Sequence, residues 1–274
     1  MNLLGRIAGV LLLVASMMAL PLGPAMAEEP FRLFPGARFL MGMDWSMLWL
    51  SGEMLIPAGG QPGSGTRVDV ASELGVGQAE GSTFSAQCTI LDKHVLEFDN
   101  LMFSPTGLKQ TPREFRFQNR TYPAGALLET RLNINWLRLN YGYKLVDEPS
   151  WWIAPRIGGH YLRCVTSVNG ESKEEGVLSN TRSLDAFYPV IGLQARYLFP
   201  YGLDAGLQIE GVHLITRGFL TMILFGVNWE IHPNTVFTVG AFNRIVQSVE
   251  DNQPLNNEWF YLISGYSAGV SFGF

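Results

Sequence analysis

A period of two governs most of this chain. From Gly36 onward, apolar residues alternate with polar residues or glycine, most clearly in residues 191–199, 203–210 and 225–231. Successive side chains of a β-strand point to opposite faces of the sheet, so this period predicts strands with one continuous apolar face. The alternation therefore predicts an all-β fold, in which the opposite face carries charged residues, amides and glycine.

We expect ten antiparallel strands, within a range of eight to twelve. Most exceed the roughly 9–11 residues that a tilted strand needs to cross a bilayer, whereas no run after residue 27 approaches the roughly 18 apolar residues of a spanning helix. The expected strands cover residues 37–50, 82–92, 94–104, 127–146, 151–168, 182–199, 202–215, 218–231, 235–249 and 258–274.

The connections between these strands alternate in length. Tight turns follow every second strand, whereas longer connections, at 51–81, 105–126, 169–181 and 250–257, follow most of the others. Short turns on one side and long loops on the other are typical of an outer-membrane β-barrel. A sheet can cross lipid only without a free edge, because every backbone polar group must be satisfied within the protein. We therefore expect a single closed transmembrane β-barrel.

The first 27 residues have the features of a secretory signal peptide. Arg6 supplies a positive start, residues 10–20 an apolar segment, and Ala25-Met26-Ala27 a cleavage site. We expect the mature barrel domain to be residues 28–274, an integral protein of the outer membrane. An even number of strands then places both termini on the periplasmic side, with the long loops outside.

The C-terminus carries a second signature. Ser267, Gly269, Phe272 and Phe274 form a Ser-x-Gly-x-x-Phe-x-Phe pattern in the last eight residues. This pattern resembles the terminal signal of Gram-negative outer-membrane barrels. The resemblance implies that the barrel-assembly machinery recognises the final strand, which we expect to pair with residues 37–50 and close the barrel.

A narrower resemblance involves two loop regions. Residues 65–75 and 117–125 are similar to segments of poorly characterised Gram-negative barrel proteins, although Arg120 stands where those proteins have the glycine of an Asn-Gly turn. The resemblance implies no activity. We expect residues 114–122 to form a small hairpin beyond the membrane, and residues 68–75 to contain one helical turn capped by Asp69.

The inward face of the predicted barrel is rich in ionisable residues. Buried charges persist when they are paired and hydrogen-bonded, so we expect a luminal charge network that fills a narrow barrel, with a polar conduit or outer binding pocket as the alternative. The expected positive members are Arg38, Arg131, Arg138, Lys144, Arg156, Arg196 and Arg244, and the negative members are Asp44, Glu97, Asp99, Glu129, Asp204, Glu210 and Glu230.

In the expected strand 127–146, the residues that we expect to face inward do not all fall on the same side of the strand. Glu129 and Arg131 share one parity, whereas Arg138 and Lys144 have the other. All four can face inward only if a β-bulge near Trp136 shifts the register. Without that bulge, the inward assignment of one half of the strand is wrong.

Catalytic and binding motifs are weak. His160 is the one histidine expected in the lumen, and we see no Ser-His-acid set and no acidic pairs like those of the omptin proteases. We expect no metal, because the cysteine and histidine spacing fits no zinc pattern, and no cofactor. Nucleic-acid binding is disfavoured, since 19 Lys and Arg face 24 Asp and Glu.

Three functions remain open. The first is a non-enzymatic structural or surface-interaction barrel, in contact with outer-membrane lipid and lipopolysaccharide. The second is a small pore for small or amphipathic molecules. The third is a barrel enzyme that modifies lipid A or another envelope component, for which the likeness is architectural only.

Overall fold

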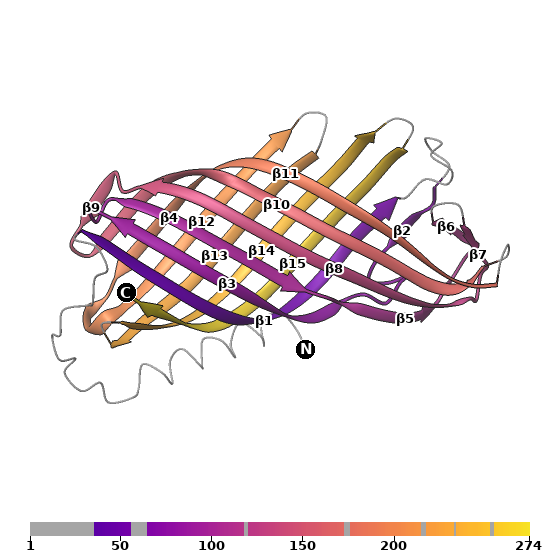
Figure 1. Ribbon diagram of the computed structural model, residues 1–274, viewed down its shortest axis with the longest axis horizontal. Coiled ribbons are helices and arrows are strands. Elements are labelled where there is room, and N and C mark those ends of the chain that lie inside the picture. Colours follow the sequence, from indigo (N-terminus) through magenta and orange to yellow (C-terminus); the bar gives the residue numbers. More distant parts are fainter. Residues whose placement is uncertain are drawn as a thin grey trace.

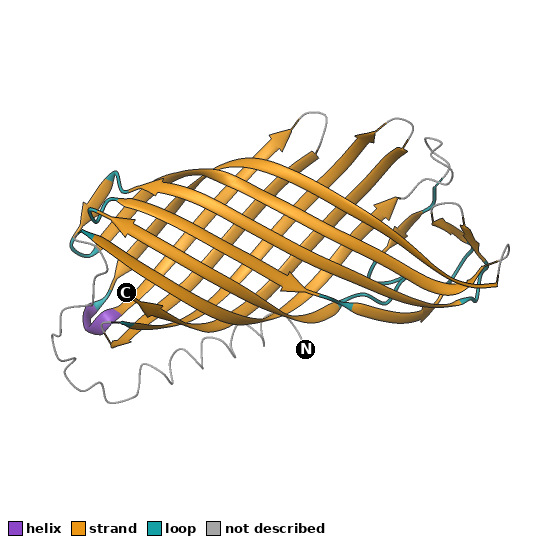
Figure 2. Cartoon of the chain, in the orientation of Figure 1, coloured by secondary structure: helices purple, strands orange, loops and turns teal. Residues whose placement is uncertain are grey.

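The computed structural model describes residues 36–55, 65–117, 120–172, 176–214, 218–232, 234–252 and 255–274. The expected signal peptide, residues 1–27, lies outside these residues. Nearly the whole described chain is strand, with one short 3-10 turn at Pro200–Gly202 (Figure 2). No helix in this part of the chain is long and apolar enough to cross a membrane.

Ten long strands form the wall of the barrel, as the sequence predicts (Figure 1). They are β1 (Ala37–Leu55), β3 (Gln78–Ile90), β4 (His94–Phe103), β8 (Leu127–Tyr143), β10 (Trp151–Ser172), β11 (Gly176–Leu198), β12 (Leu203–Leu214), β13 (Gly218–His232), β14 (Thr235–Asn252) and β15 (Leu255–Gly273). Short strands are β2 (Arg67–Asp69), β5 (Thr106–Gln110), β6 (Phe115–Phe117), β7 (Arg120–Tyr122) and β9 (Val146–Glu148).

The wall closes on itself through its first and last strands. Each long strand pairs antiparallel with the next, and β15 pairs with β1 from Gly273 opposite Leu40 to Glu258 opposite Leu55. This closure confirms the all-β, closed antiparallel barrel. It also removes the free edge that lipid would leave unsatisfied.

The two ends of the barrel differ. We call the end that carries β9, the 3-10 turn and the C-terminus the turn end, and the opposite end, which carries β2, β5, β6 and β7, the loop end (Figure 1). A tight turn joins β3 to β4 with Leu91 and Asp92 at positive φ, as the twist of a type I′ hairpin turn requires. The turn end therefore keeps its connections short.

Strand pairing at the loop end extends further than the sequence suggests. Residues 51–55, 78–81 and 176–181, expected in loops, continue the strands. The inner face of the first two extensions packs into an apolar core, as Met54 and Ala79 do, and an antiparallel ladder tolerates a polar outer face. Within the loops, β6 and β7 form the expected hairpin, and the Glu73 amide donates to the Asp69 carbonyl at 3.0 Å, which confirms the expected helical turn.

The apolar face of the wall points outward. Met43, Leu139, Ile157 and Phe187 are exposed on the outer surface, where a bilayer would cover them, and their sequence neighbours face the lumen. A β-strand separates its two faces strictly, so a membrane protein of this kind has its apolar side outside.

Strand β8 settles the conflict of parity. Its pairing with β4 and β10 runs without a register shift, so the expected bulge near Trp136 is absent from this described strand. Arg138 is buried in the lumen, whereas Glu129 and Arg131 are exposed on the outer surface. The inward placement of Glu129 and Arg131 is wrong, because a regular strand cannot turn all these side chains to one side.

Candidate functional site

Side chains fill the lumen in three successive layers. Along β10, from the turn end to the loop end, inward residues change from Trp152 through Arg156 and His160 to Leu162 and Val168. The same sequence of layers recurs on β4, β8 and β14. The barrel therefore contains a polar cavity near the turn end, a charge belt in the middle, and an apolar core near the loop end.

The charge belt is centred on two arginines. Arg138 bonds Asp99 through Nε, and its other nitrogens lie 3.8 Å from Glu97 and 3.7 Å from Glu210. Arg156 donates to Glu97 at 2.7 Å and lies 3.3 Å from Glu210. Both guanidinium groups are almost completely buried, so the carboxylates offset the large cost of removing them from water.

The Glu210 carboxylate accepts hydrogen bonds from several further polar side chains of the belt. The Trp136 indole donates to His160 Nδ1 at 3.1 Å, so His160 Nε2 carries the proton and donates to Glu210 at 2.8 Å. Asn140 donates to the same carboxylate at 2.7 Å, and Gln208 does so as well. This arrangement uses His160 as a neutral structural bridge with both ring nitrogens engaged.

Arg244, on β14, is the third arginine of the belt. Its guanidinium group lies 5.0 Å from the ring centre of Trp136 and 5.2 Å from that of Phe242, within cation–π range. Its Nη2 lies 3.9 Å from Asp99 Oδ1. The aromatic rings therefore provide part of the compensation that ion pairing gives the other two arginines.

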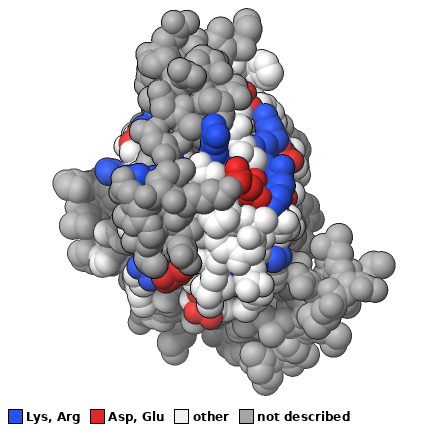
Figure 3. All heavy atoms as spheres, turned by 90° about the vertical axis from the view of Figure 1, so that its right-hand side faces the viewer, with Lys and Arg blue, Asp and Glu red and all other residues white. Residues whose placement is uncertain are grey.

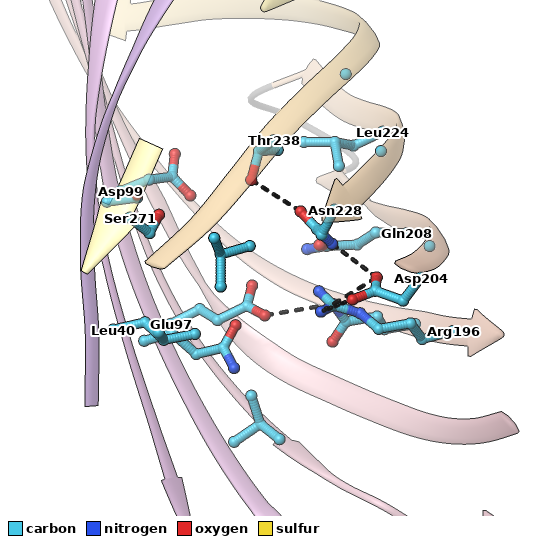
Figure 4. Close-up of a pocket in the computed structure, with 18 of the residues that line it drawn as sticks. Leu40, Glu97, Asp99, Arg196, Asp204, Gln208, Leu224, Asn228, Thr238 and Ser271 are labelled. Atoms are coloured by element: carbon cyan, nitrogen blue, oxygen red, sulfur yellow. Dashed lines mark hydrogen bonds and ion pairs between the residues drawn. The ribbon is translucent and has the colours of Figure 1, made fainter. Parts of the chain in front are cut away.

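A cavity of about 420 Å³ lies between the belt and the turn end. On one side, Thr238 donates to Asn228 at 2.8 Å, Asn228 donates to Asp204 at 2.7 Å, and Arg196 pairs with Asp204 at 3.5 Å (Figure 4). Asp99 and Ser271 lie on the opposite side of the cavity. The Arg38–Glu230 pair, at 2.9 Å, is half-exposed nearer the turn end.

The loop-end half of the lumen is apolar, which the sequence analysis missed. Trp136, Tyr188, Trp259 and Tyr261 are fully buried there among aliphatic side chains. A cap covers them, formed by the inward residues of β2, the following turn and the β6–β7 hairpin. Its buried members are Val68, Val70, Leu74, Val76, Phe117 and Tyr122.

Twelve of the predicted network residues line the lumen as the sequence predicts, together with Lys144, whereas Glu129 and Arg131 do not. The inward residues are Arg38, Asp44, Glu97, Asp99, Arg138, Arg156, His160, Arg196, Asp204, Glu210, Glu230 and Arg244. The amides Asn140, Gln194 and Gln208 join this network as well; the alternation predicts amides on the inward face but does not show that they bond to these charges.

The C-terminal pattern lies on β15 and on Phe274, the residue that follows it. Phe272 and Phe274 are exposed outward, and Gly269 faces inward, where a Cβ atom would clash with Asp44 Oδ1. Glycine therefore leaves room for that carboxylate. The role of these residues and of Ser267 in assembly stays a prediction.

Charged side chains at the loop end form surface pairs (Figure 3). Arg67 lies 2.6 Å from Glu258, and Arg113 lies 2.8 Å from Glu73. The hydrogen bond from Arg113 holds the pKa of the Glu73 carboxyl below its usual value. In the described residues, no three His, Cys, Asp or Glu side chains are placed to hold a metal ion.

Comparison with known proteins identifies the fold. No protein-family model matches the sequence, and no curated protein is significantly similar. The translocator domain of the autotransporter NalP from Neisseria meningitidis has a TM-score of 0.42 and 13% identity over 98% of this chain and 95% of that chain. The structure is similar to the outer membrane protease OmpT from Escherichia coli, with a TM-score of 0.58 and 14% identity over 86% of this chain and 97% of that chain. This chain therefore has the closed antiparallel barrel fold of a Gram-negative outer-membrane protein.

Proposed function

We propose that this protein is a closed outer-membrane barrel with a structural or surface-interaction role. The observation that carries the proposal is the filling of the lumen by both the charge belt and the apolar core. A molecule that crossed the barrel would have to break the ion pairs of Arg138 and Arg156 and then displace tightly packed aromatic residues. Removing such groups from their partners costs several kcal/mol.

The test is conductance in planar bilayers with the refolded protein. We expect no steady openings, since neither layer leaves a continuous polar path. Insertion is checked separately by the heat-dependent gel shift of the same sample. Steady, large openings of inserted protein would overturn the proposal in favour of the small-pore alternative.

We also propose that the turn end is periplasmic, with both termini there, and that the loop end is extracellular. The short turns and the polar loop end support this orientation. Trypsin added to intact cells should cut at Lys109 or Arg113, both exposed at the loop end, and spare Lys144 near the turn end. Cleavage near Lys144 alone would mean the opposite orientation.

The outer surface of one wall supports contact with lipopolysaccharide. Along β8, β10 and β11, outward residues change from apolar, as at Leu139 and Phe187, to polar, as at Arg131 and Arg163, nearer the loop end. We propose that the apolar band meets lipid chains and that these arginines meet lipopolysaccharide phosphates. The double variant Arg131→Gln, Arg163→Gln should then retain less lipopolysaccharide on purification, whereas equal retention would count against the contact.

The barrel is proposed to have no enzymatic activity. His160, the candidate base in the lumen, is fully buried and engaged through both ring nitrogens. Mass spectrometry of lipid A from cells with and without the gene tests the envelope-enzyme alternative. Identical profiles are expected, and a changed acyl or phosphate pattern would favour the enzyme.

We propose that the barrel-assembly machinery binds the final strand before closure. Until β15 pairs with β1, its backbone edge and its outward Phe272 and Phe274 are available for recognition. Deleting Phe274 should lower the amount of membrane-inserted protein without changing export. Insertion at wild-type level would remove the support for this role.

A further inference from the structure

Among the carboxylates that face inward from the long strands of the described barrel, one is left without an ion pair. Arg38 pairs with Glu230, Arg196 with Asp204, and Lys144 with Asp147, at 2.9, 3.5 and 3.7 Å. The arginines of the charge belt pair with Glu97, Asp99 and Glu210. Each cation that lines the turn-end half of the described barrel is therefore matched.

Asp44 has no such match. It faces inward from β1 and lines the cavity, and among the described residues no cation lies within ion-pair distance of its carboxylate. On the neighbouring strand β15, Gly269 lies opposite Asp44 and has no side chain that could bond to the carboxylate. A carboxylate in this position is an acceptor directed toward the cavity.

A second acceptor lies deeper. The side chain of Asp99 is 6% exposed and lines the same cavity, and its Oδ1 accepts no hydrogen bond. Arg244 approaches this oxygen only to 3.9 Å, beyond hydrogen-bond distance. Buried polar atoms in proteins are normally hydrogen-bonded, so this oxygen has capacity for a donor from a ligand.

The remaining lining favours a small organic molecule. Hydroxyl and amide groups of Ser85, Gln87, Thr238 and Ser271 surround the acidic positions. The volume of about 420 Å³ falls within the range of small-molecule sites, about 300–1,000 Å³. These groups can satisfy the polar atoms of a ligand whose charge is neutralised by a carboxylate.

We propose that this cavity binds a small organic monocation, an amine or guanidine with further hydrogen-bonding groups, that enters from the turn end. Its cationic group bonds Asp44 and approaches Asp99, and its polar body contacts the hydroxyl and amide lining. This cavity is at the opposite end of the barrel from the loop-end surface, so the two would act independently. A ligand held here would stay on the turn-end side of the charge belt.

The test uses 4-amino-1-butanol as the probe and 1,4-butanediol as its uncharged match, with binding followed by saturation-transfer NMR on the refolded full barrel in neutral detergent. We expect saturable binding of the amine and none of the diol. Asp44→Asn should weaken binding about tenfold, the loss of one charge-assisted hydrogen bond. Asp185→Asn, the same change on the outer surface, should leave binding unchanged.

A second variant and a competition experiment complete the test. Ser85→Phe narrows the cavity without removing a charge and should also weaken binding, so the result does not depend on the folding of the Asp44 variant alone. Equal affinity of wild-type protein and the Asp44 variant, or absence of saturable binding, would overturn the proposal. Displacement of the amine by equimolar calcium chloride would overturn the organic ligand in favour of an inorganic cation.

Discussion

The two halves of the lumen are filled by different physical means. Toward the turn end, the charge belt holds Arg138 and Arg156 through specific ion pairs with Glu97 and Glu210. Toward the loop end, Trp259, Tyr261 and their neighbours pack as in a soluble protein core. An apolar side chain needs only neighbours of suitable shape, whereas a buried charge needs a particular partner at a particular distance.

This difference explains where empty space remains. Apolar packing leaves few voids because dispersion contacts are lost wherever a gap opens. Polar side chains of fixed length must meet their partners, so the space around them is filled less evenly. The cavity accordingly lies on the turn-end side of the belt, next to Asp44 and Asp99.

The largest effect is expected from breaking the belt. Arg138→Met leaves Asp99, Glu97 and Glu210 with less compensation and should lower the free energy of unfolding by about 3–5 kcal/mol. Urea unfolding in detergent, followed by tryptophan fluorescence, measures this. Adding Asp99→Asn should restore part of the loss, because it removes one of the unpaired charges.

The matched control is Arg131→Met on the same strand. Arg131 is exposed on the outer surface, so its replacement should change stability by no more than about 0.5 kcal/mol. Equal losses for Arg138→Met and Arg131→Met would mean that the lumen does not depend on the belt.

An effect of similar size, with a lower minimum, is expected in the apolar core. Leu132→Ala removes a fully buried side chain and should cost about 2–5 kcal/mol, without leaving any charge unpaired. The same unfolding assay measures it, with Leu139→Ala, on the lipid-facing side of β8, as the control. A larger loss for the Leu139 variant would contradict the assignment of faces.

The smallest effect is expected at the surface of the cap. The pKa of Glu73 is lowered by its hydrogen bond from Arg113, so its contribution is complete above the unfolded-state pKa, about 4.3, and is lost as pH falls through the lower folded-state pKa. Glu73→Gln should cost about 0.2–1 kcal/mol at neutral pH. The difference from wild type should vanish in acid.

Unfolding as a function of pH tests this, with Glu148→Gln as the control. Glu148 is exposed on β9 at the other end of the barrel, so its variant should follow wild type at every pH. A Glu73 deficit that persisted unchanged in acid would contradict the ionic origin of the effect.

Several parts of the site could be predicted from alternation alone. Because parity along a strand determines the face, the sequence pattern was sufficient to place Glu97, Asp99, Arg156 and Glu210 inside the barrel. The same rule places Gln194 and Gln208 inside, because their parity matches that of their charged neighbours. It failed for Glu129 and Arg131. Alternation shows which residues of a strand share a face, but a residue of known orientation in the same strand is needed to tell which face points inward.

The sequence by itself determined the strand period, the outward apolar face, the alternation of short and long connections, and the closing strand, because these depend on neighbours along the chain. The tertiary structure alone decided which charges meet, that the loop end is packed with apolar side chains, and that no cation of the described residues pairs with Asp44. Those outcomes depend on strands far apart in sequence, such as β4, β10 and β12, meeting across the lumen at distances that no local pattern encodes.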